Sequence, residues 1–162
     1  MRDEVDVRKF DVADLVHRCE ELRALNLDSI FSTNMLEHLK DDVTVIREMS
    51  AVVRPGGRVV NFVPAFRYLY GDNDRVIGHY RRYEPAELRA KMAAAGLIVE
   101  KVFTFNQAGV FAWLTTSKIL RRTNASGGQY ASFDKLVPLF RIWEKIVPLP
   151  IGLSLIGVGH TA

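Results

Sequence analysis

The chain has 162 residues, which is enough for one domain with a single sizeable hydrophobic core. Its formal net charge is only +3 without a long run of Lys or Arg, so the composition gives little support to nucleic-acid binding. Cys19 is the only cysteine, which excludes an internal disulfide and a cysteine-built metal site, and we expect a soluble cytoplasmic protein without a membrane span.

The first elements expected are a strand and a helix. Val5 to Phe10 alternates apolar and polar residues and predicts a strand, with Asp11 at its carboxyl end. Apolar residues at helical spacing then predict a helix from about Ala13 to Leu25. Taken by itself, Asp11 is explained equally well as a cap of this helix.

The next stretch reads as strand, helix and strand. Ser29 to Ser32 is a short, mostly apolar run, and Arg58 to Val63 is a longer one that is typical of a strand buried on both faces. Between them, apolar residues at helical spacing predict a helix from about Asp42 to Val53. The carboxylates of Asp41 and Asp42 can accept from the free N–H groups at its start, and Pro55-Gly56-Gly57 ends it. Such a unit closes as a right-handed parallel crossover, and ligands of such sheets bind beyond the carboxyl ends of the strands.

Two motifs lie at or near those ends. Asn34-Met35-Leu36-Glu37-His38-Leu39 follows the first strand, and Arg54-Pro55-Gly56-Gly57 precedes the second, which ends in Val63-Pro64. Further along, Gly78-His79-Tyr80-Arg81-Arg82-Tyr83 is followed by Glu87-Leu88. Together these motifs resemble the class I S-adenosylmethionine-dependent methyltransferases, in particular the small-molecule enzymes that include the ubiquinone-biosynthesis O-methyltransferases. The second motif is similar to a bacterial subgroup of the same enzymes.

The resemblance implies the fold. It predicts a Rossmann-like α/β sheet, mostly parallel, with Leu153 to His160 as an antiparallel edge strand beside Leu97 to Phe105. It covers nearly all of this chain but only about the last two-thirds of the family's domain, because the sequence contains no Gly-x-Gly-x-Gly loop. We therefore expect residues 1–162 to form a single methyltransferase domain that is truncated at its N-terminus. The truncation would leave an open sheet edge through which two copies associate.

The resemblance also implies S-adenosylmethionine as the cofactor. Asp11 would accept a hydrogen bond from the adenine amino group, and the Val12 backbone N–H would meet the ring. Asn34 and Met35 would contact the methionine end of the cofactor, and Glu37 would hold the loop or the helix start beside it.

Two histidines are candidates for the catalytic base, because a histidine can exchange a proton near neutral pH. His38 is the first candidate and His79 the second. The alternative explanation of Glu37 and His38 is a polar turn and helix cap. The functional interpretation requires the loop that ends at His38 and the segment that ends at Tyr83 to converge on one hollow above the rim of the sheet.

Pro64 to Tyr83 is a long connection after a strand end, where substrate contacts are common. Tyr70, Arg81, Arg82 and Tyr83 are the candidate contacts to a small-molecule acceptor, with arginine suited to an anionic or polyhydroxylated group. An equally good alternative is that Arg81 and Arg82 form salt bridges that pin this connection to the body of the protein.

The remaining chain carries further turns and helices. Gly71 to Asp74 predicts a turn and lacks the ligand spacing of a calcium loop, and we expect no metal site. Glu84-Pro85 begins a helix that Gly96 ends. Residues 106–148 are expected to be a helical insertion between the last two strands, either packed on the sheet or acting as a lid with peripheral membrane contact.

These observations leave competing functions. The leading hypothesis is methyl transfer from S-adenosylmethionine to an oxygen, nitrogen or carbon of a small-molecule or glycan- or lipid-like acceptor. The alternative is a catalytically silent methyltransferase-like module that binds a partner or dimerises. A nicotinamide-dependent dehydrogenase is the weakest hypothesis, because the glycine fingerprint of dinucleotide-binding folds is missing.

Overall fold

The structure is a computed structural model that describes residues 18–114, 146 and 150–162. The predicted strand Val5 to Phe10, the first part of the predicted helix from Ala13, and most of the insertion 106–148 lie outside the described residues. Among the residues that are described, no helix has the length and the apolar character needed to cross a bilayer.

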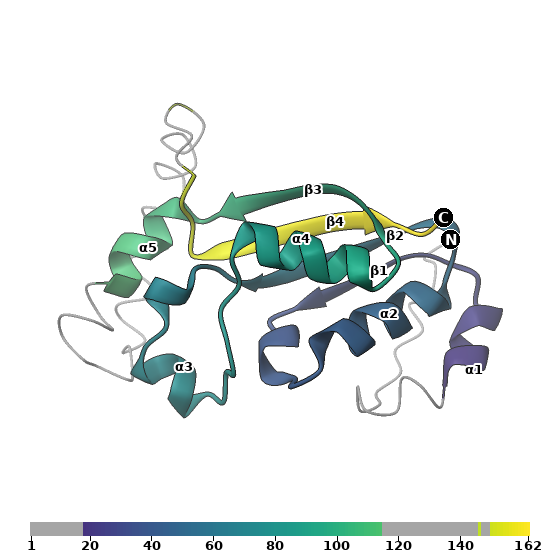
Figure 1. The fold of residues 1–162 in the computed structure, drawn as a ribbon, viewed down its shortest axis with the longest axis horizontal. Helices are drawn as coiled ribbons and strands as arrows, with labels where there is room; N and C mark the ends of the chain where they lie inside the picture. The colour runs from purple at the N-terminus through teal and green to yellow at the C-terminus, as the bar shows by residue number, and fades with distance from the viewer. Residues whose placement is uncertain (1–17, 115–145, 147–149) are drawn as a thin grey trace, which may run out of the picture.

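The described elements follow the predicted order of strands and helices (Figure 1). They are α1 (Cys19–Ala24), β1 (Leu27–Thr33), η2 (Leu36–His38), α2 (Asp42–Val52), β2 (Val53–Pro64), η3 (Arg67–Leu69), α3 (Asp72–Val76), α4 (Pro85–Ala94), β3 (Ile98–Phe105), α5 (Gln107–Trp113) and β4 (Ser154–His160).

The sheet formed by these strands has the order β1-β2-β4-β3. β1 pairs with β2 in parallel, and β4 is antiparallel to both β2 and β3, so β1, β2 and β3 share one direction. The predicted edge position of the last strand is wrong, because β4 lies inside the sheet and β3 forms the rim. Glycines let α4 close directly over β4, since a Cβ at Gly157 would lie 2.6 Å from Met92 Sδ.

The hydrophobic core lies between one face of the sheet and the helices α2 and α4, which lie over the same face in Figure 1. The strands contribute alternate residues to it, as expected for a pleated sheet. Its buried side chains include Ile46, Met49 and Val52 from α2, Leu88 and Met92 from α4, and Val59, Val63 and Leu155 from the strands. The other face carries aromatic side chains, among them Phe31, which is 75% exposed, and Phe105, whose ring meets that of Phe62.

The start of β2 differs from the prediction. α2 ends at Val52, and the segment Pro55-Gly56-Gly57 belongs to β2 instead of forming a separate tight turn. Leu27 pairs with Val53 but Ser29 pairs with Arg58, so the intervening residues of β2 bulge out of the ladder. The bulge needs glycine, because a Cβ at Gly57 would lie 2.8 Å from the Asp28 carbonyl oxygen.

The carboxyl ends of β1, β2 and β3 meet at one edge of the sheet, where α3 and α5 lie (Figure 1). After each of these strands comes a residue other than glycine with a positive φ: Asn34 at 47°, Phe66 at 60° and Asn106 at 62°. Asparagine tolerates this conformation, whereas a bulky phenylalanine is strained in it. Such strained positions are concentrated at functional sites, so this edge is the place to look for one.

The predicted turn at Gly71 to Asp74 is instead the start of the short helix α3. The Asp74 carboxylate accepts a hydrogen bond from the Gly71 backbone N–H at 2.9 Å. The backbone N–H groups at a helix start have no partner within the helix, and this contact supplies one of them with an acceptor. The same hydrogen bond holds the Asp74 side chain at the edge of the sheet.

Candidate functional site

The two candidate histidines lie side by side. His38 ends η2 and His79 follows α3, and their ring centroids are 4.6 Å apart in an edge-to-face arrangement. Gly78, directly before His79, has a φ of 81°, a backbone conformation that favours glycine. The two predicted segments therefore meet, but the hollow at this edge is lined by neither histidine, so the single hollow that the prediction required is not shown. His38 is exposed, whereas the His79 side chain is only 9% exposed.

Glu37 lies directly beneath the histidines and is completely buried. Its backbone carbonyl accepts a hydrogen bond from the Tyr80 N–H at 2.8 Å, so it holds the loop that carries His79. Neither of its carboxylate oxygens has a hydrogen-bond partner among the described residues, and Oε1 lies 3.6 Å from His79 Nε2. Burial raises the pKa of Glu37 to about 7, because the charged form loses its hydration.

Asp74 fixes the orientation of His79. Its Oδ1 lies 2.9 Å from His79 Nδ1 and accepts a hydrogen bond from Arg82 Nε at the same distance. Because a carboxylate can only accept, His79 carries its proton on Nδ1 and turns Nε2 toward Glu37. Burial lowers the pKa of His79 despite the opposing effect of Asp74, so the ring is neutral at pH 7.

Asp42, at the start of α2, connects the loop to the body of the protein. Its buried Oδ2 accepts from Arg81 Nη1 at 3.0 Å, from the Tyr83 hydroxyl at 2.7 Å and from Lys91 Nζ at 2.5 Å. Burial, reinforced by Asp42, raises the pKa of Tyr83, so its hydroxyl stays protonated as a donor. Arg81 thus pairs with Asp42, and Arg82 pairs with Asp74. These are salt bridges of the kind that the alternative explanation of the two arginines predicted.

A hollow of about 490 Å³ opens beside this network. It brings together three of the four predicted substrate contacts, Tyr70, Arg81 and Arg82, whereas Tyr83 is completely buried and does not line it. Sequence reasoning missed Tyr80, which is 54% exposed, and Arg67, which pairs with Glu87 at 2.8 Å. Both residues lie in the long connection from Pro64 to Tyr83, and this position is the sequence signal that could have identified them.

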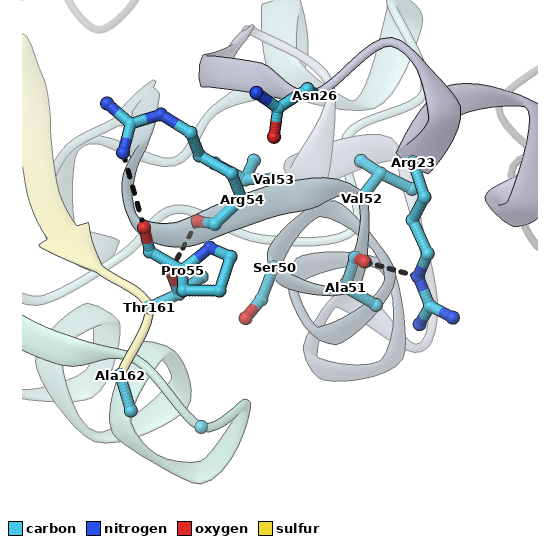
Figure 2. A pocket seen from close by; sticks show the side chains of 11 residues that line it. Arg23, Asn26, Ser50, Ala51, Val52, Val53, Arg54, Pro55, Thr161 and Ala162 are labelled. Carbon is cyan, nitrogen blue, oxygen red and sulfur yellow. Dashed lines mark hydrogen bonds between the residues drawn. The ribbon is translucent and has the colours of Figure 1, made fainter.

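A second hollow, of about 410 Å³, lies at the opposite edge of the sheet, where β2 starts and β4 ends (Figure 2). Hydrogen bonds join its lining residues to one another: Arg23 Nε donates to the Ala51 carbonyl, and the Thr161 hydroxyl donates to the Arg54 carbonyl. None of the predicted site residues lines this hollow. The carboxyl edge, with its buried carboxylate and paired histidines, is therefore the candidate site.

Comparison with known proteins shows which proteins the chain resembles. Residues 2–61 match the family described as "Methyltransferase domain". The chain is 28% identical over 143 residues to a ubiquinone biosynthesis O-methyltransferase of Xanthomonas axonopodis pv. citri (strain 306), and the match covers 79% of this chain and 56% of that protein. The crystal structure of an S-adenosylmethionine-dependent methyltransferase from Archaeoglobus fulgidus has the same fold, with a TM-score of 0.51 at 15% identity over 98% of this chain and 68% of that one.

The chain is therefore similar in sequence to known methyltransferases, and its fold is that of one of them. It spans about half the length of the Xanthomonas relative that it matches. The predicted α/β fold class is confirmed, with the position of β4 as the correction.

Two of the residues predicted to contact the cofactor, Asn34 and Met35, lie directly after β1. Asn34 is exposed at the end of β1, and its side-chain amide offers both a donor and an acceptor. Its backbone N–H donates to the Phe62 carbonyl at 3.0 Å, which fixes the turn. Met35 is half-buried beside it, while Asp11 and Val12, predicted to meet the adenine, lie outside the described residues.

Proposed function

We propose that this protein takes part in methyl transfer from S-adenosylmethionine to a hydroxyl oxygen of a small-molecule acceptor. The observation that carries the proposal is the meeting of the Asn34 loop with His38 and His79 at the carboxyl edge of the sheet. Oxygen is the proposed acceptor atom because the Xanthomonas relative is described as an O-methyltransferase. When bound, S-adenosylmethionine supplies an already activated methyl group, which leaves positioning and proton removal to the protein.

The acceptor would occupy the hollow that Tyr80 and Arg81 line, directly after His79 in the chain. Tyr70 and the more exposed Tyr80 offer aromatic surfaces there, and Arg81 offers a guanidinium group, whereas Arg82 lines the hollow but is only 3% exposed. Both arginines are already paired with buried carboxylates, Asp42 and Asp74, which reduces the net charge they present. The lining therefore favours an aromatic or hydroxylated molecule over a strongly anionic one.

His38 is the proposed base. It is the exposed member of the histidine pair, so an acceptor hydroxyl can reach its imidazole. As the acceptor oxygen forms its bond to the methyl carbon, the hydroxyl proton would pass to an imidazole nitrogen of His38. The ring of His79 supports that of His38 from the side and is itself held by Asp74, so His79 is the second candidate and the positioning partner.

The test is methyl transfer from tritiated S-adenosylmethionine to a panel of phenols and polyols. We expect His38→Ala to lower kcat by roughly 100-fold or more, the usual contribution of a general base, and His79→Ala to lower it less. His160→Ala is the matched control, because that histidine pairs with Glu100 at the other end of the sheet. Full kcat in both His38→Ala and His79→Ala would show that the assignment of the base is wrong.

One observation favours a second candidate function, a catalytically silent module that pairs with another copy of itself. β1 is the rim of the described part of the sheet, and Phe31 on this strand is 75% exposed. A rim strand and an exposed aromatic side chain both invite association. Sedimentation with and without S-adenosylmethionine, together with calorimetry, separates the two: dimerisation without cofactor binding supports the module, and cofactor binding supports the enzyme.

A further inference from the structure

The arrangement of Glu37, His38 and His79 creates an electrostatic problem at the bottom of the site. His79 Nε2 carries a lone pair, because Nδ1 holds the proton that Asp74 accepts. This lone pair faces the carboxylate of Glu37, whose Oε1 is 3.6 Å away. Two acceptors that face each other in a buried place repel unless a proton or a metal ion lies between them.

The spacing suits a metal ion. Ligands bound to one ion at 2.0–2.2 Å lie roughly 3–4 Å from each other, and the separation of Glu37 Oε1 from His79 Nε2 falls in this range. A nitrogen of His38 completes the set, since the donor atoms of all three residues lie within 4.8 Å of one another.

The surroundings also suit a metal ion. A histidine that binds a metal commonly donates its other ring N–H to a carboxylate, which fixes its tautomer and orientation. His79 has this arrangement with Asp74, and Arg82 in turn holds Asp74. The Glu37 carboxylate is fully buried, has no hydrogen-bond partner among the described residues and is aimed at His79, as expected of a ligand that lacks its ion.

We propose that Glu37, His38 and His79 bind a divalent transition-metal ion of the Zn²⁺ class. Two imidazoles and one carboxylate favour Zn²⁺, Fe²⁺ or Co²⁺ over Mg²⁺ or Ca²⁺, which prefer sets made only of oxygen ligands. Three protein ligands leave at least one position open to water or to an acceptor hydroxyl. Where the proposed methyl transfer holds, the ion would lower the pKa of a bound acceptor hydroxyl, and the proton would pass to solvent water or to the ring nitrogen of His38 that does not bind the ion.

Calorimetric titration of the chelator-treated full chain with ZnCl₂ tests the site. We expect one ion per chain and at least a 100-fold loss of affinity in His79→Ala and in Glu37→Gln. Asp74→Asn should lower the affinity by 10- to 100-fold, the usual effect of losing a carboxylate that orients a ligand. Circular dichroism checks that the buried variants fold, and His38→Ala, at an exposed position, tests the site with little risk to folding.

Two matched controls separate this site from adventitious binding. His160→Ala removes a histidine that also lies beside a carboxylate, Glu100, at 3.2 Å, and Cys19→Ser removes the only thiol. Both should leave zinc binding unchanged. No binding, or binding that survives His38→Ala and His79→Ala but not a control substitution, would overturn the proposal. The titration needs neither cofactor nor acceptor, so its failure is distinct from failure of the proposed methyl transfer.

Discussion

Replacing Asp42 with alanine is expected to lower the free energy of unfolding by about 3 to 5 kcal/mol. The Asp42 side chain is 3% exposed and accepts from Arg81, Tyr83 and Lys91 through a single oxygen. Its removal leaves the buried Tyr83 hydroxyl without its acceptor and takes from two partly buried cations the carboxylate that they share, although Lys91 keeps its pair with Glu87. Urea denaturation followed by circular dichroism measures the loss.

The neighbouring aspartate is the matched control. Asp41 is exposed and caps α2, where its carboxylate accepts from the Thr44 backbone N–H at 3.1 Å, as its predicted capping role requires. Asp41→Ala should cost only about 1 kcal/mol, the usual effect of losing an N-cap. Similar losses in the two variants would show that the Asp42 network adds little to stability.

Replacing Glu37 with glutamine is expected to stabilise the metal-free protein at pH 8 by roughly 3 kcal/mol, the equivalent of its pKa shift. Burial raises the pKa of this carboxyl from 4.5 to about 7, so the folded state holds the proton more tightly than the unfolded state. The free energy of unfolding of the unsubstituted protein is therefore highest, as far as Glu37 determines it, below about pH 4.5, and it falls as the pH rises to about 7. Glutamine imitates the protonated carboxyl at every pH and avoids this loss.

The measurement is the free energy of unfolding of both proteins in chelator at pH 4.5 and at pH 8. The two should be nearly equal at the lower pH and diverge at the higher one. Glu20→Gln, at an exposed position in α1, serves as the control and should change the stability by less than about 0.5 kcal/mol. A Glu37→Gln variant that is less stable at pH 8 would mean that the ionised carboxylate is compensated by a neighbouring positive charge.

Much of the fold could be predicted from local patterns. The apolar runs of β1, β3 and β4 and the helical stripe of α2 lie close to their predicted bounds, because periodicity and capping act over a few residues. The bulge at Pro55 to Gly57 was missed, since glycine and proline signal a turn equally well when the partner strand is unknown. The inner position of β4 could not be predicted, because it depends on the packing of Gly157 under α4, a contact between residues far apart in the sequence.

The site was predictable only in part. Motifs and the strand-end rule brought His38 and His79 to one edge, and their contact confirms that placement. The sequence showed Asp74 as a turn residue, however, and its contact with His79 arises only once α3 folds back. The burial of Glu37 was equally hidden, because a glutamate next to a histidine in a polar loop is usually exposed.

The most direct test of the site's location is the response of backbone amides to S-adenosylmethionine in the nitrogen-15 NMR spectrum of the full chain. A site at the carboxyl edge predicts that the amide signals of Asn34, Met35 and Ala65 shift as the cofactor is added. The contrary result would be shifts at Val53, Arg54 and Thr161 around the opposite hollow, or an unchanged spectrum at millimolar cofactor.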